Sequence, residues 1–71
     1  MQPQVAYATP LERDVTYDAR AQHGGLPITV HYDDGGTSES LLVLDPSQLE
    51  LYHYQTGRIL TLRDEDLGGL L

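Results

Sequence analysis

One stretch of the sequence, residues 26–44, constrains the fold more than any other. It places an alternating run, Ile28 to Asp33, before an Asp-Asp-Gly-Gly tetrapeptide and a second apolar run. Apolar and polar residues that alternate with a period of two are typical of a strand with one face on a core and the other in water. Glycines tolerate the positive φ angles that a tight turn needs. The stretch therefore predicts a β-hairpin with strands at about 27–33 and 37–44.

The second strand of this hairpin ends in four consecutive apolar residues, Leu41 to Leu44. Such a run is expected where a strand is buried on both faces or bends across the corner of a barrel. The strand register around these residues stays open, because the run fits either face of a sheet.

A helix is predicted before the hairpin. Thr9-Pro10-Leu11-Glu12 matches a capping box, with proline at the tolerant first helical position. Apolar residues then recur four apart, at Leu11, Val15 and Ala19. This spacing predicts an amphipathic helix over about 10–23, ended by Gly24-Gly25. Residues 1–8 are expected to form a flexible arm ahead of a single domain that spans residues 9–71.

After the hairpin, two patterns compete. Asp45-Pro46-Ser47-Gln48 matches another capping pattern. The alternation and the Gln-Thr-Gly-Arg turn that follow favour instead a second hairpin, with strands at about 49–54 and 58–63 and at most one helical turn around Pro46. Three leucines near the end fit either a short last strand or a frayed terminus: Leu67, Leu70 and Leu71.

Charge is the most informative bulk property. Eleven acidic residues face four arginines and no lysine, for a net charge of −7. Because Lys and Arg supply most nucleic-acid affinity, a chain this acidic would repel a polyanion, and we expect no direct nucleic-acid binding. The surplus either faces the basic surface of a protein partner or serves solubility alone.

Other features of the composition narrow the class of protein. A chain of 71 residues makes one small domain. It has no cysteine, which excludes disulfides and thiolate metal sites. No apolar run approaches the roughly 20 residues of a membrane span, and the first residues lack the features of a signal peptide. A soluble, cytoplasmic protein is therefore expected.

The residue patterns favour neither an enzyme nor a metal protein. His31 and His53 lack the spacing of structural zinc ligands. The adjacent acids Asp33 and Asp34, with Glu39, match neither a calcium loop nor the paired carboxylates of a deep cleft. No nucleophile is paired with a base, and no phosphate-binding glycine loop follows a strand. We expect no catalysis and no cofactor.

Three tyrosines admit two interpretations: Tyr32, Tyr52 and Tyr54. Core or rim packing is one role, with the hydroxyl groups reaching water. If they are exposed, they are better candidates for a protein-binding hot spot than for base stacking, which normally comes with a basic groove.

The predicted order of elements resembles a small Sm-like or SH3-like barrel, a bent sheet of five strands, here mainly β with one N-terminal helix. Within that group the chain resembles the Rho-off family of transcription-termination inhibitors over roughly residues 11–67. Gln22-His23 stands between helix and first strand as in that family. The strand and acidic turn of residues 28–36, and the charged run of residues 58–64 before Leu67, match its outline.

The resemblance implies an inhibitor that binds the hexameric helicase Rho where single-stranded RNA normally binds, with acidic residues in place of phosphates, and so acts in transcription antitermination. Carried over to this chain, the partner-binding candidates are Asp14, Asp18, Asp33, Asp34 and Glu39. Two alternatives stay open: a self-assembling Sm-like module that joins through its edge strands, and an antitoxin or immunity protein that inhibits a nuclease. A monomer is favoured over an oligomer.

Overall fold

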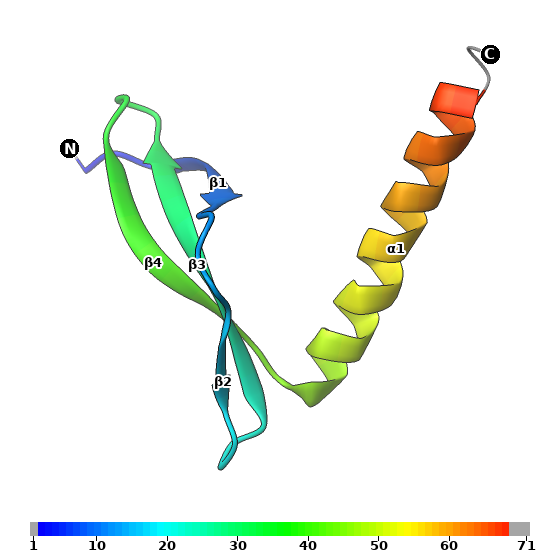
Figure 1. Ribbon diagram of the computed structural model, residues 1–71. Helices are drawn as coiled ribbons and strands as arrows, with labels where there is room; N and C mark the ends of the chain where they lie inside the picture. Colours follow the sequence, from blue (N-terminus) through cyan, green and yellow to red (C-terminus); the bar gives the residue numbers. More distant parts are fainter. Residues whose placement is uncertain (1, 69–71) are drawn as a thin grey trace.

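A computed structural model describes residues 2–68 as an antiparallel sheet followed by one long helix (Figure 1). In chain order the elements are β1 (Val5–Pro10), β2 (Thr16–Asp18), β3 (His23–Tyr32), β4 (Thr37–Leu44) and α1 (Pro46–Gly68). The prediction of a small, mainly β protein with one helix is confirmed at this level. The predicted place of the helix is wrong, because α1 follows the sheet instead of preceding it.

Strand β3 lies at the centre of the sheet. On one edge it pairs with β4, from Gly24 with Leu44 to His31 with Thr37. On the other edge, β1 pairs with the second half of β3 and β2 pairs with the first half. Within residues 2–68 the four strands form an open sheet, so the fifth strand and the closure of the predicted barrel are not shown.

The central hairpin is confirmed, and local hydrogen bonds explain its turn. Gly35 has a φ of 89°, which a residue with a side chain rarely adopts. The Asp34 carboxylate accepts a hydrogen bond from the Gly36 N–H at 2.8 Å. The Tyr32 N–H donates to the Gly36 carbonyl oxygen at 2.9 Å and closes the turn. Turn formation therefore depends on neighbouring residues, which is why the sequence predicts it well.

The helix predicted over 10–23 is absent, because the residues expected to begin it pair with β3 as a strand. Thr9 and Pro10, the expected cap, are instead the last residues of β1, and they pair with Thr29 and Ile28. Farther on, the Val-Thr-Tyr run at 15–17 favours the extended backbone that β2 adopts. Strand β1 likewise occupies much of the arm expected at 1–8.

The second hairpin predicted at 49–54 and 58–63 is also wrong, because both segments lie in α1. The capping pattern at Asp45 prevails. The Asp45 carboxylate accepts hydrogen bonds from the Gln48 N–H at 2.8 Å and the Ser47 hydroxyl at 2.9 Å. In return, the Gln48 side-chain oxygen accepts from the Asp45 N–H at 2.9 Å, which completes a capping box. Leu67 is helical, and Leu70 and Leu71 lie outside the described residues.

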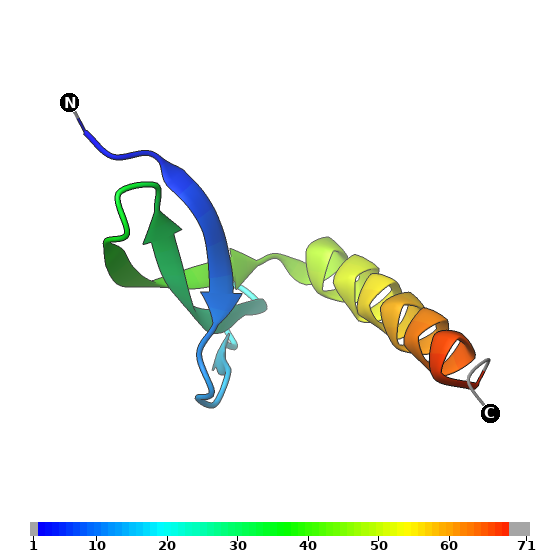
Figure 2. The ribbon, with the colours of Figure 1, turned by 90° about the horizontal axis from the view of Figure 1, so that it is seen from above.

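Helix α1 contacts the sheet only near its start. Figures 1 and 2 both show it extending away from the strands. The Leu49 side chain lies over Gly24 of β3, so close that an added Cβ there would be 2.8 Å from Leu49 Cδ2. Among the described residues, Leu44 is the one buried apolar side chain, and none is buried in α1. The radius of gyration is 15.8 Å, whereas a compact chain of this length has about 11 Å.

The cap makes helix stability depend on pH. Hydrogen bonds from the Gln48 N–H, and then from the Ser47 hydroxyl, hold the pKa of Asp45 below its ordinary value of 3.8. A lowered folded-state pKa contributes stability above the unfolded-state pKa, and this contribution is lost as pH falls through the folded-state pKa. We expect circular dichroism at 222 nm to show loss of helix below about pH 4. Asp45→Asn should remove that step, and an unchanged step would contradict the cap.

Two glycines should respond in opposite ways to alanine. Gly24→Ala pushes against Leu49 Cδ2, the end of a side chain that can shift, and should destabilise the fold by about 1 kcal/mol through overpacking. Gly57 lies inside α1 with no atom within 4 Å of its added Cβ. Because alanine is the better helix former, Gly57→Ala should stabilise by about 1 kcal/mol. Urea denaturation measures both, and equal signs would contradict this packing of α1.

Candidate protein-binding surfaces

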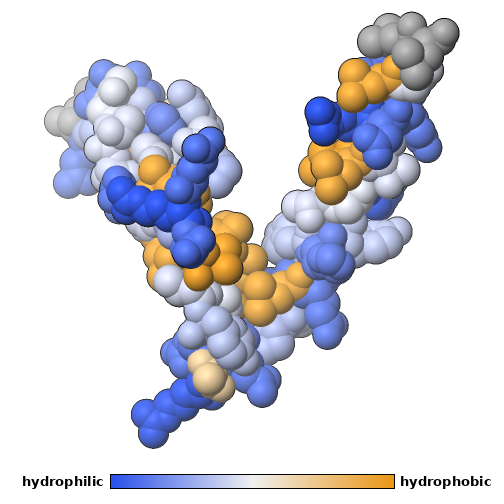
Figure 3. Space-filling model, viewed as in Figure 1, coloured by the Kyte–Doolittle hydropathy of each residue, from blue (hydrophilic) through white to orange (hydrophobic). Residues whose placement is uncertain are grey.

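An extended apolar surface lies where the sheet meets the helix. Leu26 and Leu42 are register partners, so their side chains lie on the same face of the sheet. This face and the first half of α1 enclose an open groove of about 350 Å³. We call it the sheet–helix groove, and its lining residues are Leu26, Leu42, Val43, Leu44, Gln48, Tyr52 and Thr56. Figure 3 shows the apolar surface running from the sheet onto the helix.

Strand β4 leaves large apolar side chains in solvent. Leu41, Leu42 and Val43 are 47%, 45% and 53% exposed, and only Leu44 at the strand end is buried. The sequence predicts that this run is buried on both faces of a strand or bends across the corner of a barrel, and the exposure contradicts the first of these. In the single chain, β1 and β2 lie on the far edge of β3, and α1 covers only the end of β4. The run is therefore apolar enough for a core, but no element within residues 2–68 covers it.

The helix extends the apolar surface beyond the groove. With about 3.6 residues per turn, residues three, four or seven positions apart lie on one side of a helix. Tyr52 and Thr56 line the groove. Ile59 and Leu60 lie on the same side of the helix, beyond Thr56, where the groove ends. Ile59 and Leu60 are 63% and 56% exposed. Leu67 extends this side to the last turn, so we define the helix stripe as Tyr52, Thr56, Ile59, Leu60 and Leu67.

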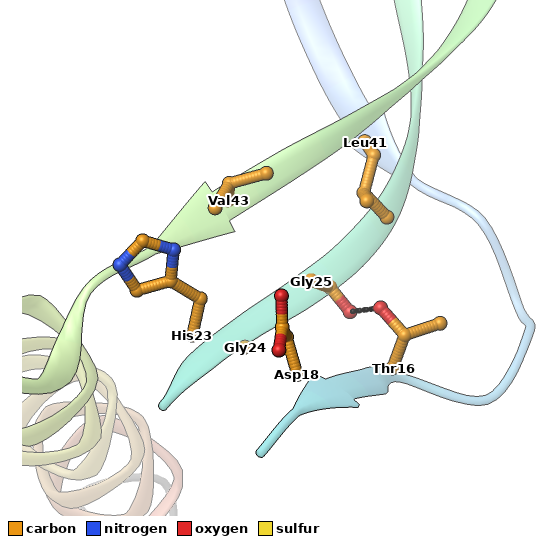
Figure 4. Close-up of a pocket in the computed structure, with 7 residues that line it drawn as sticks. All are labelled: Thr16, Asp18, His23, Gly24, Gly25, Leu41 and Val43. Atoms are coloured by element: carbon orange, nitrogen blue, oxygen red, sulfur yellow. Dashed lines mark hydrogen bonds between the residues drawn. The ribbon is translucent and has the colours of Figure 1, made fainter. Parts of the chain in front are cut away.

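A smaller depression of about 150 Å³ lies between β2 and β4 (Figure 4). Gly24 and Gly25 form its floor, and the other lining residues are Thr16, Asp18, His23, Leu41 and Val43. The Thr16 hydroxyl donates a long hydrogen bond, 3.5 Å, to the Gly25 carbonyl oxygen. Because Val43 and Gly25 are register partners, the depression exposes the face of β4 that alternates with Leu42.

The structure spreads the predicted partner-binding acids along the sheet. Asp14 lies between β1 and β2, and Asp18 lies in β2, so neither is on a helix as predicted. Asp33 and Asp34 sit together in the turn between β3 and β4, while Glu39 lies in β4. These residues therefore do not share one element, although the turn pair does present two neighbouring carboxylates.

Glu39 differs from the other candidates because it is neutralised. Its carboxylate forms an ion pair with the Arg13 guanidinium, with Nη2 and Oε1 3.2 Å apart and both side chains about 60% exposed. A second hydrogen bond of 3.3 Å, from Nη1 to Oε2, makes the contact bidentate. Among residues 2–68 this is the one ion pair, which leaves the other acids uncompensated there.

Backbone hydrogen bonds hold the turn acids in place. Asp33 Oδ1 accepts from the Gln4 N–H at 3.1 Å, and Asp34 Oδ1 accepts from Gly36. Asp18 Oδ1 accepts in the same way from the N–H groups of Arg20 and Ala21, at 3.0 and 3.3 Å. Within the described part of the chain, Oδ2 of each carboxylate has no hydrogen-bond partner. These oxygens are exposed acceptors in fixed positions.

The histidines and tyrosines have separate environments. The His31 ring stacks on Tyr7 with ring centroids 4.3 Å apart, and its Nε2 lies 2.8 Å from the Thr9 hydroxyl. His23 begins β3 and lines the smaller depression, while His53 lies in α1. Nowhere in residues 2–68 do three or more potential metal ligands gather.

Of the three tyrosines, Tyr52 is the one that lines the sheet–helix groove. It is 49% exposed, and Tyr54 is 63% exposed. Tyr32 is half-buried in β3, and its hydroxyl lies 2.9 Å from the Ser38 hydroxyl. The exposure of Tyr52 and Tyr54 fits the hot-spot alternative more closely than the core one. In the sequence, the Asp45 capping pattern is the signal that could have distinguished Tyr52 from Tyr54. It sets where α1 begins, and the helical spacing then determines which tyrosine faces the sheet.

Comparison of the chain with protein-family models, with curated proteins and with solved structures found no match. In the described residues, α1 is the only helix, and it lacks the apolar stretch that crossing a bilayer would take.

The Arg13–Glu39 pair should contribute little to stability. Because both side chains are well exposed, solvent screens their attraction, and we expect a coupling free energy below about 1 kcal/mol. A double-mutant cycle with Arg13→Ala and Glu39→Gln, followed by urea denaturation, measures it. A coupling well above that limit would show that the pair is buried in solution, against the exposure described above.

Proposed function

We propose that this protein is an acidic regulator that binds a basic protein and occupies the surface where that protein takes nucleic acid. The observation that carries the proposal is the uncompensated charge. Eleven acids stand on a chain with four arginines, and within residues 2–68 only Glu39 has an ion-pair partner. Electrostatic complementarity of this kind speeds the encounter with a basic surface and fixes its register.

The turn acids suit this role by their geometry. Asp33 and Asp34 each use one oxygen to hold the backbone, so the other oxygen is available to a partner's arginine or lysine. A carboxylate that is already held in position loses little conformational freedom when it binds a partner. In this respect it resembles a phosphate held in a nucleic-acid backbone. Inhibition then requires occupancy of the partner's surface and no chemical step.

A Rho-type termination factor is the most specific partner we propose, with antitermination as the outcome. The predicted N-terminal helix and second hairpin, on which the likeness to Rho-off proteins depends, are replaced here by strands and by α1. Support for this partner therefore comes from the acidic surplus and the turn acids.

Neutralising the turn acids tests the proposal. The double variant Asp33→Asn with Asp34→Asn keeps an oxygen acceptor at each position, so the turn should fold as before. Titration against a purified Rho-type factor at low salt should show affinity reduced about fivefold, since each exposed charge contact contributes up to about 1 kcal/mol. Raising the ionic strength should shrink the difference.

The chain supplies a matched control at the far end of α1. Asp64→Asn with Glu65→Gln changes the net charge equally but lies on the helix. If the turn acids are contacts, this control should bind within twofold of the natural protein. Equal losses for both variants would show that only net charge matters, and no binding by the natural protein would reject this partner.

The outer edge of β4 favours a second candidate function, the self-assembling Sm-like module. Among the described residues β4 pairs only with β3, so its other edge presents free N–H and C=O groups. Such an edge can add a strand from another copy. Light scattering discriminates between the two functions, because edge-to-edge assembly gives rings or filaments of many copies.

A further inference from the structure

We propose that a second copy of this chain occupies the sheet–helix groove. In the resulting two-fold dimer, the helix stripe of each copy lies in the groove of the other. The proposal is independent of the acidic function described above, and it differs from edge-to-edge assembly because β4 contributes side chains instead of backbone hydrogen bonds.

The first argument for a dimer is the large exposed surface of the single chain. Its accessible surface is 6144 Å², whereas a compact monomer of 7.9 kDa exposes about 4,400 Å². The excess is about 1,700 Å² per chain, or about 3,400 Å² for two chains. Obligate homodimers bury about 2,000–5,000 Å² in total, so a dimer would account for the whole excess.

The chemistry of the groove explains how two acidic chains can associate. All seven lining residues are uncharged, and interface cores are depleted of charged side chains. On the helix, Glu50 and Glu65 fall on the side opposite the stripe, whereas Asp64 and Asp66 border its last turn, given about 3.6 residues per turn. The groove itself therefore carries no charge, and the acids that border the stripe lie at the rim of the contact, where solvent and salt screen them.

A two-fold pairing also accommodates the cation on this side of the helix, Arg63. If two α1 helices cross antiparallel about a point near Gly57, Arg63 of one copy lies opposite Tyr52 of the other. A guanidinium over a tyrosine ring is favourable, and the aliphatic stem of arginine covers apolar surface. Two-fold symmetry repeats the contact, so both copies use the same residues.

The helix itself needs a packing surface. Only its first turns contact the sheet, and no α1 side chain is buried. The acids at 64–66 stand where the helix dipole favours cations, which destabilises the last turn. Because a helix in water gains most of its stability from packing, a second copy would supply what this chain lacks.

Sedimentation equilibrium from about 1 to 100 µM tests the proposal, supported by light scattering. The natural protein should have twice its chain mass of 7.9 kDa. Tyr52→Glu and Ile59→Glu each bury a carboxylate in the contact and should raise the dimer dissociation constant by at least about a hundredfold. Tyr54→Glu and Thr61→Glu add the same charge on the opposite side of α1 and should leave it within about threefold.

Ile59→Glu guards against a folding defect. Tyr52 lines the groove of its own chain, so its replacement can also disturb the fold. Ile59 is 63% exposed and does not line the groove, so its replacement acts on the contact alone. Because the chain has no cysteine, Thr56→Cys should form an intermolecular disulfide on oxidation, and Thr61→Cys should not.

Several results would overturn the proposal. One is a monomer at every concentration, whether extended or with a radius of gyration near 11 Å, the value expected when α1 folds onto its own sheet. A dimer that both stripe variants leave intact would place the interface elsewhere, and a larger ring would favour β4 edges. Because the turn-acid variants keep the groove unchanged, their effect on a basic partner reports the acidic function separately.

Discussion

Backbone hydrogen bonding to β3 is the constraint on which the fold depends. Strands β1, β2 and β4 all pair with it, and α1 reaches the sheet by laying Leu49 over its Gly24. Side-chain burial contributes little in the single chain, since Leu44 is the one buried apolar side chain in residues 2–68. A fold held mainly by its ladder gains less from the hydrophobic effect than most domains of this size, which makes a covered groove energetically important.

The sequence predicted those features of the fold that depend on interactions between residues close together in the chain. The hairpin turn depends on Gly35 and on the Asp34 carboxylate, and both are visible in the sequence. The two capping boxes show the limit of such signals. The box at Thr9 yields to pairing with Thr29, a residue 20 positions away in the chain, and it precedes a Val-Thr-Tyr run that favours a strand. The box at Asp45 begins a helix because no strand competes for it.

The candidate surfaces were only partly predictable, because they depend on how distant segments meet. The sequence shows every acid, but only the structure shows that Arg13 neutralises Glu39 and that Asp33 and Asp34 lie apart from Asp18. To predict the groove, one must know that α1 is a helix and which side of it faces β4. Tyr52 was recognised as a candidate hot spot, and helical geometry distinguishes it from Tyr54.

The division of one β3 edge between two short strands has a consequence for local unfolding. Strand β2 has three residues and exposed side chains, whereas β1 has six residues and the added Tyr7–His31 stack. The β2 end therefore opens at a lower free energy than the β1 end, as weakly packed segments do. Gly24 pairs with Tyr17 at that end and with Leu44 of β4 on its other edge, and it lies under Leu49, so each opening frees one edge of the strand on which α1 rests. Fraying of three residues therefore reaches the base of the helix without breaking the β3–β4 pairing beside it.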